Sequence, residues 1–127
     1  MADYATDFDE WLAATWAETG SQLNGFTLLI VLIGLSQGRI DLLRSTHLHV
    51  IGDDLDWPGL AANLDGAGVA WDAVALYRAG REGLVPDDVA RSRLASLIRA
   101  LQGDRTLLRE AEFLNRDGLR LQLDEAG

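Results

Sequence analysis

The residues best suited to chemistry in this 127-residue chain are two histidines and the aspartates that follow them. His47 and His49 lie in the segment from Ile40 to Ile51, where apolar and polar positions alternate as they do in a β-strand. Side chains two residues apart on a strand project from the same face, so one divalent metal ion could bridge the two imidazoles. Three carboxylates, which are hard oxygen ligands, occupy the turn that follows: Asp53, Asp54 and Asp56.

This arrangement predicts a divalent-metal site that supports hydrolysis of a phosphate or amide substrate. The His-X-His spacing resembles the metal motif at the strand ends of several families of metal-dependent hydrolases. Those families carry further His and Asp ligands, whereas this chain has two histidines in all. An extended strand advances about 3.3 Å per residue, which separates His47 from Asp53 by roughly 20 Å unless the turn folds back. In the competing interpretation, the histidines lie on the mixed face of a strand, and Asp54 or Asp56 caps a helix that begins near Pro58.

Other catalytic chemistries find no support in the sequence. The chain has no cysteine, which excludes thiol catalysis, thiolate metal sites and disulfides. Ser45, His47 and Asp41 share one strand, where alternation does not provide the geometry of a catalytic triad, and there is no Gly-X-Ser-X-Gly motif. Gly66 and Gly68 lie between a predicted helix and a strand, the reverse of the order in a dinucleotide-binding loop. No cofactor is therefore expected, apart from the divalent metal ion of the hydrolase interpretation.

The net charge of −9 is concentrated in the first 77 residues. Five acidic residues and no arginine or lysine lie between Met1 and Gln37, and the same holds between Ser45 and Tyr77. From Arg78 onward, nine arginines balance nine acidic residues, and the chain has no lysine. Such a field repels nucleic acid and anionic lipid, and it attracts a basic partner or a cation.

A tryptophan-bearing helix in the acidic half predicts an interaction surface. The segment 7–19 is amphipathic, and its acidic start suits the positive end of a helix dipole. Trp11 and Trp16 are separated by about 140° around the helix axis, so both cannot lie at the centre of one buried stripe. We therefore predict a small, acidic, non-catalytic binding protein that engages a basic protein partner through Asp7, Asp9, Trp11 and Trp16. The pattern is also compatible with a homodimer formed through this helix or an edge strand, or with both tryptophans clamping the helix to a sheet.

The order of elements predicts a single α/β domain of mixed α+β type spanning residues 1–127. Helices are expected at 7–19, 58–64 and 86–103, and strands at 26–34, 40–51, 69–77, 113–116 and 119–123. The run 26–34 is apolar on both faces, and its β-branched content favours a buried central strand over a short buried helix. The order α-β-β-α-β-α-β-β predicts a mixed sheet with helices packed on it. That sheet would contain one βαβ crossover with a locally parallel strand pair, and a C-terminal β-hairpin around Asp117-Gly118.

The sequence shows neither a secretory signal nor a membrane span. Its N-terminus is acidic where such a signal needs positive charge. The longest apolar stretch, from Gly25 to Leu35, is about half the length that a membrane-spanning helix requires. We therefore expect a cytoplasmic protein that does not associate with membranes.

Overall fold

A computed structural model describes residues 6–20, 25–51, 55–80 and 83–121 of the chain. Four strands form one open sheet in the order β2-β1-β3-β4, and every pair of neighbouring strands is antiparallel. The strands are β1 (Phe26–Ser36), β2 (Arg39–Val50), β3 (Ala73–Arg78) and β4 (Glu112–Asn115). The α-helices of the described part are α1 (Asp7–Thr15), α3 (Trp57–Asp65) and α4 (Asp87–Gly103). Two shorter helical segments follow α1 and α4, the π-helical η1 (Trp16–Gly20) and the 3-10 helix η2 (Arg105–Glu110).

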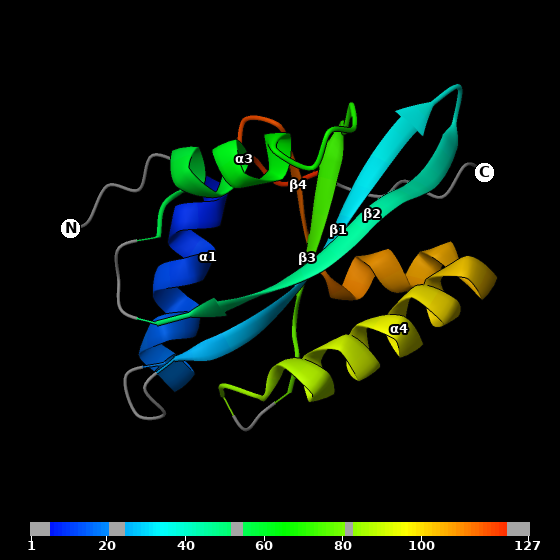
Figure 1. Cartoon of the computed structure of the whole chain (residues 1–127). Coiled ribbons are helices and arrows are strands. Elements are labelled where there is room, and N and C mark those ends of the chain that lie inside the picture. Colours follow the sequence, from blue (N-terminus) through cyan, green and yellow to red (C-terminus); the bar gives the residue numbers. More distant parts are fainter. Residues whose placement is uncertain (1–5, 21–24, 52–54, 81–82, 122–127) are drawn as a thin grey trace.

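The sheet is covered on both faces, by α1 and α3 on one side and by α4 and η2 on the other (Figure 1). Successive residues of β1 face these two layers in turn, because side chains on a strand point alternately to opposite faces. One set packs in the α1/α3 layer: Phe26, Leu28, Ile30 and Leu32. The other set packs in the α4 layer: Leu29, Val31 and Ile33. This burial on both faces explains the unbroken apolar run, and the prediction of a buried central strand is confirmed.

The predicted mixed α+β fold is confirmed, but the predicted locally parallel strand pair is wrong. Strands β2 and β3 both run opposite to β1, so α3 does connect two strands of the same direction, as a crossover requires. They are not neighbours, because β1 lies between them and pairs with both. A strand that is apolar on both faces gains most from an interior position, whereas the partly exposed β2 is tolerated at the edge. The sheet is therefore antiparallel throughout its described part.

The other predicted elements are present with shifted boundaries. Thr6 caps α1, since its hydroxyl oxygen accepts a hydrogen bond from a backbone N–H of the first turn. Strand β3 is shorter than expected and begins at Ala73. The C-terminal hairpin turns at Gly118, whose φ is 77°, and its second arm is an isolated bridge from Arg120 to β4. None of the described helices has both the length and the apolar character needed to cross a membrane.

Tyr77 links β3 to η2 on the α4 side of the sheet. Its hydroxyl donates a hydrogen bond to the carbonyl oxygen of Leu107 at 2.9 Å. Burial of the phenol, reinforced by the negative charge of Glu110, raises the pKa of Tyr77 to about 12. The folded protein therefore favours the neutral phenol more strongly than the unfolded chain does.

We expect the free energy of unfolding to fall as the pH rises from about 10 to about 12. The stabilisation from neutral Tyr77 is complete below the unfolded-state pKa of about 10, and it is lost as the pH passes through the raised folded-state value. Because the chain has no lysine or cysteine, Tyr4 and Tyr77 are the only side chains that titrate in this range. Urea unfolding at about pH 9 and about pH 11 should show the loss in the wild type and in Tyr4→Phe. An equal loss in Tyr77→Phe would contradict this assignment.

Candidate metal centre

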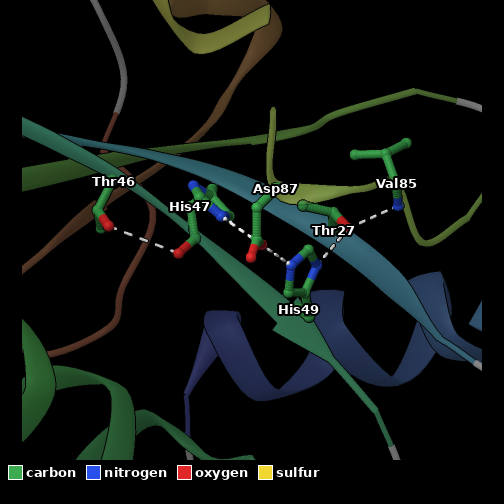
Figure 2. A network of polar contacts seen from close by, with 6 residues as sticks. All are labelled: Thr27, Thr46, His47, His49, Val85 and Asp87. Atoms are coloured by element: carbon green, nitrogen blue, oxygen red, sulfur yellow. Dashed lines mark hydrogen bonds and ion pairs between the residues drawn. The ribbon is translucent and has the colours of Figure 1, made fainter. Parts of the chain in front are cut away.

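Two histidines of β2 and the first residue of α4 bring three ligand atoms together (Figure 2). The Nε2 atoms of His47 and His49 lie 3.0 and 2.5 Å from the same oxygen, Oδ1 of Asp87. All three ligand atoms lie within 4.8 Å of one another. Asp87 is 38 residues from His49 and 40 residues from His47 in the sequence, so the tertiary fold alone creates this cluster.

The β1–β2 ladder directs both imidazoles toward α4. His47 pairs with Leu29 and His49 pairs with Thr27 in the antiparallel register. Leu29 belongs to the layer packed against α4, and residues opposite each other in a ladder share a face of the sheet. The sequence prediction that the two histidines lie on one face is therefore confirmed, and that face is the one covered by α4.

The first turn of α4 supplies the carboxylate. Pro86 has an extended backbone, and its carbonyl oxygen accepts the N–H of Ala90 at 2.9 Å, so the helix begins at Asp87. Val85 and Ala90 are buried in the α4 layer and fix this end of the helix against the sheet. A carboxylate in a first helical turn is also favoured by the positive end of the helix dipole. The local sequence thus places Asp87 at a fixed point opposite β2.

A buried hydroxyl supports the cluster from behind. Thr27 is fully buried, and its Oγ1 lies 2.8 Å from Nδ1 of His49, the ring nitrogen that points away from Asp87. The same oxygen accepts the backbone N–H of Val85 at 3.1 Å. Figure 2 shows this chain of contacts running from Val85 through Thr27 and His49 to Asp87.

The electrostatics of the cluster keep Asp87 in its charged form. The hydrogen bond from His49, followed by that from His47, lowers the pKa of Asp87 and outweighs the opposing effect of desolvation. The side chain of Asp87 is 62% exposed, against 18% for His47 and 32% for His49. The imidazoles are therefore largely sheltered, and the cluster opens to solvent on the carboxylate side.

Two imidazole nitrogens and one carboxylate oxygen form a ligand set suited to divalent transition metals such as Zn²⁺, Co²⁺, Ni²⁺ or Fe²⁺. Ligands about 2.0–2.1 Å from an ion, at angles of about 90° to 110°, lie about 2.9–3.4 Å apart. The separation of 3.0 Å between Nε2 of His47 and Oδ1 of Asp87 meets this requirement. The 2.5 Å between His49 and Asp87 is a direct hydrogen bond, and it must lengthen by about half an ångström when an ion replaces the proton. Three ligands leave the remaining coordination positions to solvent.

Of the three aspartates predicted as ligands, the described residues include Asp56 alone, and its carboxylate binds elsewhere. Asp56 is the N-cap of α3, and its Oδ1 accepts the backbone N–H of Gly59 at 2.9 Å. The capping interpretation is therefore confirmed for Asp56, and its role as a ligand beside the histidines is wrong. Asp53 and Asp54 lie outside the described residues, so their predicted ligand role stays a prediction.

Asp87 is a candidate ligand that sequence analysis missed. The sequence signal at this position is an acidic pair after Pro86, at the start of a long helix. That pattern is common at helix N-termini and does not by itself indicate a metal ligand. Recognising Asp87 would have required knowing that α4 packs against β2.

The two carboxylates predicted for a partner surface hold α1 to distant parts of the chain. Oδ2 of Asp7 accepts the backbone N–H of Arg120 at 2.8 Å. Oδ1 of Asp9 accepts the backbone N–H of Trp57 at 3.1 Å. Charge reversal at either position would therefore disturb the fold as well as any binding surface.

Trp11 and Trp16 are both partly buried and pack against the α1/α3 core. Trp11 also lines a recess of about 330 Å³. The other lining residues are Leu76, Tyr77, Arg78, Glu110 and Glu112. Binding of a basic partner at this surface stays a prediction, and the affinity of the Trp11→Ala variant for a polyarginine peptide is its test. Unchanged affinity would exclude this recess as the binding surface.

Comparisons with known proteins supply no relative on which to base a function. No protein-family model, curated protein or solved structure gives a significant match to this chain. Among the residues that the structure describes, His47, His49 and Asp87 form the one group of His and carboxylate side chains whose ligand atoms lie close enough to hold a metal ion.

Proposed function

We propose that this protein binds a divalent transition-metal ion through His47, His49 and Asp87. The observation that carries the proposal is the convergence of two Nε2 atoms on one carboxylate oxygen, at 3.0 and 2.5 Å, from two separate elements. Two neutral imidazoles and one carboxylate favour transition metals over Mg²⁺ and Ca²⁺, which prefer sets made up of oxygen ligands. Hydrolysis at such an ion stays a prediction, in which metal-bound water would supply the nucleophile.

Calorimetric titration of tag-free protein with Zn²⁺ and Co²⁺ tests the proposal. His47 and His49 are the only histidines and the chain has no cysteine, so any imidazole coordination must come from this cluster. We expect one ion per chain and a Co²⁺ visible absorption spectrum typical of nitrogen and oxygen ligands. Free Zn²⁺ at about 100 times its Kd should stabilise the fold by about 2.7 kcal/mol, which raises Tm by roughly 10 °C.

A matched pair of variants separates coordination from general charge effects. Asp87→Asn and Asp88→Asn remove the same charge from neighbouring exposed positions of the same helical turn. We expect Asp87→Asn and His47→Gln to abolish the binding of one equivalent of Zn²⁺, and Asp88→Asn to retain it. If the wild type takes up no Zn²⁺ or Co²⁺, or if Asp87→Asn binds as the wild type does, the proposal is wrong.

A further inference from the structure

We infer that Thr27 is the positioning residue of this metal site, which presents Nε2 of His49 to the ion and ties His49 to the segment that carries Asp87. The inference rests on the proposed metal-binding function. Thr27 is a fully buried polar side chain in the central strand β1, whose neighbouring residues from Phe26 to Ile33 are otherwise apolar. Such a hydroxyl is costly to bury unless its hydrogen bonds are made.

The hydrogen bonds of Thr27 determine which nitrogen of His49 is free for a ligand. A hydroxyl has one donor and two acceptor positions, and the N–H of Val85 occupies one of the acceptor positions at 3.1 Å. Nδ1 of His49 faces the remaining donor or acceptor position at 2.8 Å. When Nε2 coordinates an ion, the imidazole proton must reside on Nδ1, and Thr27 Oγ1 is placed to accept it. Without an ion the hydroxyl can donate to Nδ1 instead, which leaves the proton on Nε2 facing Asp87.

Thr27 also sets the position of the segment that leads to Asp87. Val85 lies two residues before Asp87, and its backbone N–H donates a hydrogen bond to the Thr27 hydroxyl oxygen. The backbone N–H of Thr27 donates to the carbonyl oxygen of Gly83 at 3.3 Å, so main chain and side chain both hold this segment. His49 is the direct cross-strand partner of Thr27. One residue of β1 therefore fixes two of the three ligands relative to each other.

Two substitutions separate the role of the hydroxyl from that of the volume of the Thr27 side chain. Thr27→Val removes the hydroxyl and keeps the branched shape, whereas Thr27→Ser keeps the hydroxyl. We expect Zn²⁺ binding to weaken about 10- to 100-fold in Thr27→Val and to stay near the wild-type value in Thr27→Ser. Val31→Ala is the stability control, because Val31 is fully buried on the same face of the same strand away from the cluster. It should lower Tm and leave the Zn²⁺ affinity unchanged.

Nitrogen-15 correlation spectra of the histidine side chains supply a readout that a purely structural role would not move. In the Zn²⁺-bound wild type we expect His49 to carry its proton on Nδ1, with Nε2 bound to the ion. This measurement holds even if Thr27→Val fails to fold. Coordination through Nδ1, or a Thr27→Val variant that binds Zn²⁺ as tightly as Val31→Ala does, would overturn the positioning role while leaving the metal site in place. A wild type that binds no metal would overturn both proposals.

Discussion

Replacement of Trp71 by alanine is expected to lower the free energy of unfolding by about 4 kcal/mol. The side chain is 2% exposed and meets Trp57 edge-on, with ring centroids 6.3 Å apart. Its Nε1–H donates to Oδ1 of Asp65 at 3.0 Å, and the guanidinium of Arg116 lies over the ring, 4.3 Å from its centroid. Alanine would leave a large cavity in the α1/α3 layer and remove all three of these contacts.

Chemical unfolding followed by far-ultraviolet circular dichroism is the suitable measurement, because the substitution itself changes tryptophan fluorescence. Trp71→Phe is the matched control, since it keeps an aromatic ring and loses the indole N–H, with an expected cost of about 1–2 kcal/mol. Trp11→Ala should cost less than Trp71→Ala, because Trp11 is only partly buried. If Trp71→Ala lowers the free energy of unfolding no more than Trp11→Ala does, the prediction is wrong, and the α1/α3 layer collapses around the cavity.

Replacement of Gly25 by alanine is expected to cost about 3 kcal/mol or more. Gly25 precedes β1 with a φ of 135°, a conformation that L-residues rarely adopt. An added Cβ would lie about 2.4 Å from the backbone oxygen of Val50, an atom that cannot move without displacing the end of β2. Strain in the substituted residue and a backbone clash therefore act together.

Gly38→Ala is the control that has a positive φ and no clash. Gly38 also has a positive φ, 77°, in the β1–β2 turn, but nothing lies within 4 Å of a Cβ added there. Its substitution should cost about 1–2 kcal/mol from backbone conformation alone. The difference between the two variants in urea unfolding measures the clash at Val50 together with the extra strain of a φ of 135° over one of 77°. Equal costs would contradict the close approach of Gly25 to β2.

The elements of the fold were accessible to sequence reasoning because they depend on local rules. The apolar run of β1 predicted a strand buried on both faces, and the aspartates before Pro58 predicted a helix start that the side chain of Asp56 does cap. The turn at Gly118 followed from the need for a positive φ. The strand expected at 69–77 was predicted to include Trp71, but β3 begins only at Ala73. Trp71 is buried without belonging to the strand. An apolar residue packs equally well just before a ladder, and periodicity does not distinguish the two cases.

The order of strands in the sheet could not be derived from local patterns. The hairpin of β1 and β2 can add its next strand on either side, and in this chain β3 joins β1 and leaves β2 at the edge. That choice depends on the burial of whole strands against both helix layers. It also leaves β2 as the strand whose imidazoles meet the first turn of α4.

The sequence by itself determined that the side chains of His47 and His49 project from the same face of a strand, because the alternation of side chains along a strand is a property of the backbone. It also excluded thiol ligands and fixed the number of imidazoles at two. Tertiary structure alone decided the carboxylate: Asp87, about 40 residues away, rather than the nearby Asp56. Asp56 is committed to the first turn of α3, whereas Asp87 is brought to the histidines by the packing of α4 against β2. Proximity along the chain is a poor guide to ligand sets in this fold. An extended strand carries its side chains away from the turn that follows it, and a helix packed on the sheet brings in residues that are distant in sequence.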